Sequence, residues 1–177
     1  MTVSVRTAEP MLTLKSRLEL GSDFLIRTLK NRQLYLSEEN LEKNVIPVFV
    51  GEQTQIPSSA IPAIRVVPDS WNAKWLSTRV RIDEYRFFVD CMVRTSEADV
   101  IDEYIMVMAL AAEEWLLEFS NLQGKIDQTR SAYYDSWVDS VQFGWSKGQV
   151  WRIARITYWM KTQHAYIVPA GSGSNPC

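Results

Sequence analysis

The chain has 177 residues, of which 46% are hydrophobic and 23% charged, and its net charge is −2. This length fits one soluble domain whose core needs no metal or disulfide. The near-neutral charge argues against a dedicated nucleic-acid binder, whose binding face is strongly basic. Two cysteines, Cys91 in an apolar run and Cys177 at the end, are too few for a disulfide framework, so we expect a reducing compartment. The longest apolar run, 104–112, is too short to span a bilayer, and residues 1–10 lack a signal-peptide pattern.

The first part of the chain predicts an irregular arm followed by helix. Residues 1–10 form this N-terminal arm, which ends at Pro10. From Met11 to about Leu34, leucines recur at helical spacing with charged residues between them. Gly21 either bends one long helix or separates two short ones.

Two short apolar runs then predict strands at the edge of a sheet. Val45–Val50 contains Pro47, and Ile61–Val67 contains Pro62. Proline cannot donate a ladder hydrogen bond, so an edge position or an extended connection is expected for both runs. The Pro-Asp-Ser sequence at 68–70 is expected to close the second strand. The following segment, 69–84, is rich in Trp and Arg and is predicted to be a loop.

The middle of the chain gives the strongest patterns. Tyr85–Arg94 alternates, with Phe87, Val89, Cys91 and Val93 on one face, as a strand does when that face is buried. Ser96 with Asp99 three residues later resembles a capping box. A wide apolar stripe follows, which predicts a long helix that ends before Gly124.

The last part predicts a hairpin and a tail. Residues 128–136 are ambiguous. Trp137–Phe143, with Trp137, Val141 and Phe143 at even spacing, and Val150–Met160 are strand patterns on either side of a turn at 144–148. The Gly- and Ser-rich residues 166–177 are expected to be a flexible tail.

The order of elements predicts an α+β fold: a two-layer sandwich of helices on a largely antiparallel sheet with a C-terminal β-hairpin. The domain organisation expected is an N-terminal arm at 1–10, a single α/β domain at 11–165 and a flexible C-terminal tail at 166–177.

The residues of common catalytic sites are largely missing from this sequence. The only histidine, His164, has no nucleophile in a recognisable setting around it, and its ordinary interpretation is a residue near a strand end. No phosphate-binding glycine motif is present. Asp99, Asp102 and Glu103 have the types of side chain that bind a divalent cation, but acidic residues also favour the first turns of a helix. We therefore expect no enzyme activity, no cofactor and no metal.

Seven tryptophans are more than the core of one such domain needs. Packing accounts for about half of them, because Trp is usually well buried. Trp and Tyr also favour protein interfaces, where they bury a large area. Trp71 and Trp145, expected in a loop and at a turn, are the better candidates for interface anchors.

Charge is segregated along the chain. Residues 96–120 contain seven acidic side chains and no basic one, whereas 140–177 contain four basic side chains and no acidic one. Such runs are ordinarily solvated faces. The alternative is an acidic face on one copy that meets a basic face on the next, in a head-to-tail contact that closes into a ring. The interface candidates are Trp71, Trp75, Arg79, Arg81, Glu113, Glu114, Trp145, Lys147, Arg152 and Arg155.

Between Met11 and Thr162 the sequence has a leading helix, a VFVGE strand, IPAIRVVPDS, the strand YRFFVDCMVR, the acidic-capped helix EADVIDEYIMVMALAAEEWL and an aromatic hairpin ending in RIARITYWMKT. This order and texture of elements resembles the tail terminator and related neck proteins of tailed bacteriophages. No single motif in it is diagnostic. Two features depart from the simplest form of that pattern: the leading segment is long, and the loop at 69–84 is rich in Trp and Arg.

The resemblance implies a structural virion protein that forms a ring, commonly a hexamer, at the end of the tail tube. Such a ring caps the tube and joins it to the head connector, and DNA passes through its channel. The partners implied are further copies of the chain, the tail tube protein, head–tail connector or adaptor proteins and the sheath, with no membrane. The place implied is the neck or tail of the particle, assembled in host cytoplasm.

Two other classes of function remain open. A nucleic-acid-associated module would use five arginines on phosphates and aromatic rings on bases, with tight and salt-sensitive binding; its candidates are Arg79, Arg81, Arg86, Arg152 and Arg155. An enzyme with an unrecognised site would use Asp90 or Glu103 and would need a pocket that perturbs their carboxyl groups. Within the structural class, a connector, adaptor or completion protein has the same features.

Overall fold

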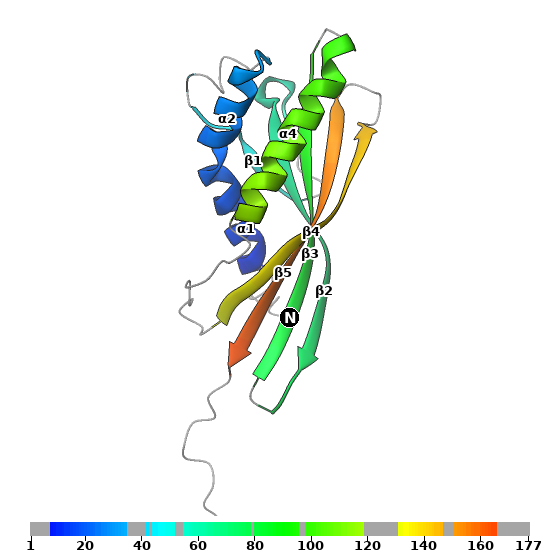
Figure 1. Cartoon of the computed structure of the whole chain (residues 1–177). Helices are drawn as coiled ribbons and strands as arrows, with labels where there is room; N and C mark the ends of the chain where they lie inside the picture. Colours follow the sequence, from blue (N-terminus) through cyan, green and yellow to red (C-terminus); the bar gives the residue numbers. More distant parts are fainter. Residues whose placement is uncertain are drawn as a thin grey trace, which may run out of the picture.

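The structure is a computed structural model, and it describes residues 8–34, 42, 44–51, 55–78, 80–95, 98–118, 131–146 and 151–165. Within these ranges, helices lie on one face of a five-stranded sheet (Figure 1). The helices are α1 (Ala8–Leu20), α2 (Ser22–Asn31) and α4 (Ala98–Glu118), with a 3-10 turn at Ser58–Ala60. The strands are β1 (Val48–Val50), β2 (Ala63–Trp75), β3 (Val80–Val93), β4 (Ser131–Trp145) and β5 (Arg152–Ala165).

The sheet has the order β1-β2-β3-β5-β4, and of its pairs only β1 with β2 is parallel. The strands β4 and β5 form the C-terminal hairpin. The α+β class, the largely antiparallel sheet and the hairpin predicted from the sequence are therefore confirmed. The division into arm, domain and tail stays a prediction, except that residues 8–10 belong to α1. Pro10 is tolerated there because the first turn of a helix has no use for its missing N–H.

The leading helical region consists of two helices that meet at Gly21. Leu14 and Leu18 of α1 and Leu25 and Leu29 of α2 are buried, as their spacing predicts. The indole of Trp115 in α4 lies against the junction between the two helices, and its Nε1 donates a hydrogen bond of 2.9 Å to the carbonyl oxygen of Arg17. The same indole ring stacks on Phe24, with ring centroids 5.9 Å apart.

Glycine is required at position 21 because a side chain would not fit there, and not because of its backbone angles. Its φ of −79° suits any residue. A Cβ at this position would lie only 2.5 Å from Trp115 Nε1 and 2.7 Å from Cδ1 of the same ring. The close approach of Trp115 to the backbone therefore joins α1, α2 and α4 into one layer.

The strand β2 is longer than its sequence predicts. It continues past Pro68 to Trp75 and pairs with β3 throughout, with Trp71 opposite Tyr85 and Trp75 opposite Arg81. The prediction of a loop at 69–84 is wrong. A shift of register between Pro68 and Ser70 accommodates the proline, which the sequence pattern could not distinguish from a strand end. We call residues 69–75 and 80–84 of these two strands the hairpin arm.

The predicted edge positions hold for one of the two short strands. The strand β1, which follows Pro47, is at the edge of the sheet. The strand β2 lies between β1 and β3 where β1 pairs with Ile64–Val66, so the edge position expected for it is wrong there. Pro62 precedes the strand and takes no place in its ladder.

A bulge in β4 changes which side chains share a face. The register of β4 on β5 shifts between Val138 and Ser140. As a result Trp137 pairs with Trp159 on the outer face, whereas Val141 pairs with Ile156 and packs on the core. Strict alternation from Trp137 to Phe143 is therefore wrong, because a bulge inserts one residue and reverses the parity of the strand.

The main core lies between the helices and the inner face of the sheet. Phe87, Val89, Cys91 and Val93 of β3 are all buried in it, as predicted, together with Tyr104, Ile105 and Met108 of α4. A second, smaller core lies on the outer face, where Ile56, Ala60 and Ile61 pack against Ala63 and Met92. The connection from β1 to β2 therefore covers one end of the outer face.

We predict that Gly21→Ala lowers the free energy of unfolding by about 1–3 kcal/mol, since the added methyl group forces the Trp115 ring or the helix backbone to move. The control is Gly144→Ala, where a Cβ meets no atom within 4 Å. Denaturant unfolding followed by circular dichroism measures both. Equal stability of the two variants would show that the contact at Gly21 does not constrain the helix layer.

We also predict that Cys91 does not react with thiol reagents in the folded chain. Burial, and to a lesser extent the Asp90 carboxylate, raises the pKa of its thiol to about 12 from an ordinary value of 9.0. The contribution of the neutral thiol to stability is complete below pH 9 and is lost as the pH rises from 9 towards 12. In a Cys177→Ser variant at pH 8, an Ellman titration should give almost no fast-reacting thiol before denaturant is added and one equivalent afterwards.

Candidate interaction surfaces

The centre of the outer face carries a buried carboxylate between two arginines. Asp90 of β3 is fully buried and pairs in register with Arg65 of β2 and Arg155 of β5. Arg65 Nη2 donates to Asp90 Oδ2 at 2.8 Å, and Arg155 donates from Nε to Oδ1 at 2.7 Å and from Nη2 to Oδ2 at 2.9 Å. The carboxylate is saturated by guanidinium groups, which compensates for its removal from water.

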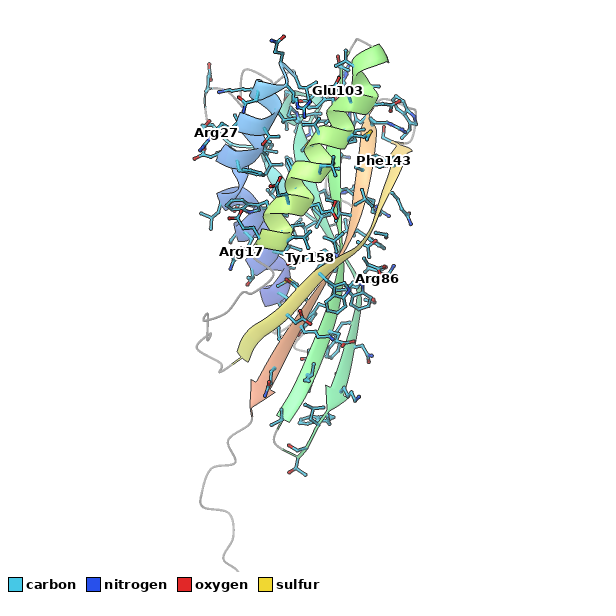
Figure 2. The ribbon with its side chains drawn as sticks, viewed as in Figure 1. Arg17, Arg27, Arg86, Glu103, Phe143 and Tyr158 are labelled. Atoms are coloured by element: carbon cyan, nitrogen blue, oxygen red, sulfur yellow. The ribbon has the colours of Figure 1, made fainter. Side chains whose placement is uncertain are left out.

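Cations and aromatic rings continue from this cluster along the outer face. The Arg155 guanidinium lies over Phe88 at 4.5 Å, and Arg86 lies over both Phe88 and Trp159. Trp159 stacks on Trp137 with centroids 5.7 Å apart. Figure 2 shows Arg86 projecting from the side of the sheet away from the helices. The face opposite the helices is therefore an ordered aromatic and ionic surface across β3, β5 and β4.

The hairpin arm carries a second aromatic cluster. Trp71 and Trp75 lie on one face of β2, and the Arg81 guanidinium lies 5.1 Å from the first ring centroid and 5.9 Å from the second. Asp83 holds this arginine with bonds of 2.6 and 2.9 Å. Trp71 also stacks on Tyr85. The two tryptophans are thus held in place although about half of each is exposed.

The outer side of α4 forms a third surface. Met106, Leu110 and Leu117 recur at helical spacing and are exposed, and Glu103 and Glu114 flank them. We call these three apolar residues the helix stripe. A surface helix is normally apolar only on its core side, so α4 carries a second apolar stripe that the described part of the chain leaves exposed.

The end of the sheet where β4 leads into β5 forms a fourth surface, which we call the hairpin end. Here the acidic and basic stretches of the sequence meet within one chain. Arg152 of β5 pairs with Asp102 of α4 at 2.8 Å and lies over the ring of Trp145. One ion pair between the two stretches is therefore intramolecular. Trp145 ends β4 and is nearly half exposed, close to its expected turn position.

The interface residues expected from the sequence fall into separate places. Trp71, Trp75 and Arg81 come together on the hairpin arm. Trp145 and Arg152 come together at the hairpin end, and Arg155 lies on the outer face. Glu113 and Glu114 are on α4, the second more exposed than the first. Arg79 and Lys147 lie outside the described residues.

The helix stripe is not among the interface candidates predicted from the sequence. Met106, Leu110 and Leu117 fall outside the apolar stripe predicted for the core side of this helix, and they have their own spacing of four and seven residues. The central position of Asp90 between two arginines is also not predicted. The alternation of β3 places Asp90 on the outer face, but its two arginine partners come from strands whose register the sequence does not define.

Asp90 and Glu103, the two carboxylates considered for catalysis, lie in different surroundings. Asp90 is enclosed by its two arginines, and Glu103 is exposed at the upper part of α4 (Figure 2). Among the described residues, no three of the side chains His, Cys, Asp and Glu lie close enough to hold a metal ion. None of the helices in those residues is both long and apolar enough to cross a membrane.

One titratable pair lies beneath the helix layer. Burial raises the pKa of Tyr158 on β5, which a hydrogen bond with Ser136 and the charge of Arg17 partly offset. Burial lowers the pKa of Arg17, and the charge interaction with Tyr158 opposes that change. Arg17 belongs to α1 and Tyr158 to β5, so this charge interaction links the first helix to the sheet.

Comparisons with protein families and with curated proteins give no match. Among solved structures, a chain from the "Virion of native gene transfer agent (GTA) particle" is similar over 80% of this chain and 93% of that chain, with a TM-score of 0.47 and 7% sequence identity. A likeness of this degree does not assign a function.

We predict that Asp90→Asn lowers the free energy of unfolding by about 3 kcal/mol, because two guanidinium groups lose the carboxylate that binds them. Asp69→Asn is the matched control, since the Asp69–Arg86 pair is 3.3 Å apart and partly exposed on both sides. That change should cost about 0–1 kcal/mol. Chemical denaturation of both variants compares them, and equal losses would contradict a special role for the buried cluster.

Proposed function

We propose that this chain is a structural protein of a tailed-phage virion and, more specifically, a ring-forming tail terminator or neck component. In this role it caps the tail tube and joins it to the head connector. The observation that carries the proposal is the number of large apolar side chains left exposed on the helices and strands and next to them. These residues include Leu12, Trp71, Trp75, Leu76, Met106, Leu110, Leu117, Phe143 and Trp145.

Exposed apolar side chains in such number favour assembly. Isolated ones are normal, but here they gather on the hairpin arm, on α4 and at the end of β4. Each group is flanked by charge, as at a protein interface with an apolar centre and a polar rim. The order of elements resembles that of tail terminator and neck proteins. We therefore infer that these surfaces take part in the assembly of a phage neck.

A nucleic-acid-associated function has less support from the same residues. Four of the five arginines considered for phosphate binding already pair with a carboxylate of the chain: Arg81 with Asp83, Arg86 with Asp69, Arg152 with Asp102 and Arg155 with Asp90. An arginine that is neutralised in this way contributes little to counterion release on binding DNA. We infer weak DNA contact without sequence preference, as in a channel through which DNA passes.

The partners proposed are further copies of the chain, the tail tube protein and the head–tail connector or adaptor, with the sheath as a further neighbour. The resemblance to tail terminator proteins implies that the copies form a hexameric ring. The place proposed is the neck or tail of the particle after assembly in host cytoplasm. A connector, adaptor or completion role belongs to the same class and would place the ring in another tier.

The test is the mass of the purified chain in solution, measured by light scattering after size exclusion, alone and with the tail tube protein of the same phage. We expect a ring of several copies, or a monomer that becomes a ring when the tube protein is added. A chain that remains a monomer in both conditions and also binds DNA tightly at low salt would overturn the proposal in favour of a nucleic-acid module.

A further inference from the structure

The acidic helix α4 does not find its basic counterpart in the C-terminal strands. The basic side chains described in 140–177 are paired within the chain: Arg152 with Asp102, Arg155 with Asp90 and Lys161 with Glu84. Residues 98–118 nevertheless contain six acidic side chains and no basic one. Among the described residues, Glu103, Glu113 and Glu114 form no ion pair. A basic surface that meets α4 must therefore come from elsewhere.

The helix α2 carries unpaired positive charge. Arg27, Lys30 and the C-cap residue Arg32 are exposed, and none of them forms an ion pair within the described part of the chain. The one acidic residue of α2 is Asp23, which accepts a hydrogen bond from the side-chain amide of Asn44. Three basic side chains against one acidic side chain give this helix and its cap a net charge of +2.

The two sets of charge do not meet within one chain, although α2 and α4 are neighbours (Figure 1). The helices contact each other through Phe24 and Trp115, whose rings stack. At about 100° per residue, Lys30 lies about 120° around α2 from Phe24, and Leu110 lies about 140° around α4 from Trp115. The cation of α2 and the helix stripe of α4 are therefore turned away from the contact that joins the two helices.

The two surfaces also match in length. Met106 and Leu117 at the ends of the helix stripe are eleven residues apart, or about 16 Å along the helix axis. The ten residues of α2 span about 15 Å. Lysine and arginine cover apolar surface with their methylene groups and keep their charged ends at its rim. The long side chains of α2 can therefore bury the stripe, with their charges beside Glu103 and Glu114.

We propose that α2 of one copy packs on the helix stripe of α4 in a second copy. Arg27 and Lys30 then lie beside the acidic residues that flank the stripe. Each copy carries one surface of each kind, so it can contact two neighbours head-to-tail, and such contacts close into a ring when the rotation between copies permits. This proposal deepens the proposed function, because it rests on self-assembly of the chain and names the two surfaces that meet.

The first test is carbodiimide cross-linking, which joins a lysine amine directly to a carboxylate that it contacts. Unlabelled and nitrogen-15-labelled chains are mixed before assembly, so that mass spectrometry distinguishes a link between copies from a link within one. We expect mixed-isotope peptides that join Lys30 to Glu103, Glu113 or Glu114. The control is Lys30→Arg, which keeps the charge but cannot couple, so assembly should persist without the link. An assembled wild-type chain that gives no mixed-isotope link at Lys30 would contradict the docking.

The second test is a charge exchange, followed by the concentration at which the oligomer dissociates in sedimentation velocity. Lys30→Glu and Glu114→Lys should each raise the dissociation constant about tenfold or more, because like charges then face each other. The two changes together should recover most of this loss, since opposite charges meet again.

The matched controls for the exchange are Lys74→Glu and Asp139→Lys. Both residues are exposed, on β2 and on β4, and the two substitutions change the net charge by the same amounts as the test variants. Neither should alter the dissociation constant, and circular dichroism verifies that every variant folds. Equal weakening by the controls would show that net charge, and not a contact between α2 and α4, governs assembly.

The outcomes separate the docking from the proposed function. If the wild-type chain forms rings but shows neither the mixed-isotope link nor recovery in the double variant, the docking is wrong and the proposed function stands. If the chain forms no ring even with the tube protein, yet Lys30 links two copies in a smaller assembly, the docking stands and the function is wrong. Absence of both rejects both.

Discussion

The four long strands of this protein, β2 to β5, are longer than the helices that cover them, and the remaining features follow from that mismatch. The strand β3 has 14 residues, or about 46 Å at the rise of a strand, whereas the 21 residues of α4 span about 31 Å. About a third of the sheet therefore extends past the helix layer as the hairpin arm (Figure 1). A single sheet without helix cover has no apolar interior, so the arm is stabilised by stacked rings and ion pairs between neighbouring strands.

The same shortage of cover applies to the outer face of the sheet. Among the residues that the structure describes, those between β1 and β2 pack on this face, and they bury one end of it. The rest is stabilised by the Asp90 cluster and by the ladder of Arg86, Phe88, Trp159 and Trp137. On this face, ion pairs and aromatic rings that are exposed to water on one side take the place of an apolar core. The surface is ordered before any partner arrives, which lowers the entropy lost on association.

The sequence predicts the elements that one strong periodic signal defines. The alternation around Phe87, Val89 and Cys91 and the long stripe of α4 both have such a signal, and they specify the fold class. Prediction from the sequence fails where one local pattern is compatible with two different structures. A proline at a position such as 68 usually indicates the end of a strand. Here a bulge accommodates Pro68, and the strand continues. In β4 the bulge between Val138 and Ser140 reverses which side chains face the core, and no residue type in the sequence predicts it. The interface candidates were found by composition, whereas the helix stripe needed knowledge of which side of α4 faces the sheet.

The bulges have a consequence for how copies of this chain can meet. Within the described residues, β4 forms one border of the sheet, and β2 forms the other beyond its short pairing with β1. Register shifts interrupt both borders, at Pro68/Ser70 in β2 and at Tyr133/Asp135 and Val138/Ser140 in β4. An irregular border is a poor template for backbone pairing with another chain. A subunit proposed to end a growing tube must not itself seed an open-ended fibre, and borders of this kind leave side-chain docking, with its defined rotation, as the available route to a closed assembly.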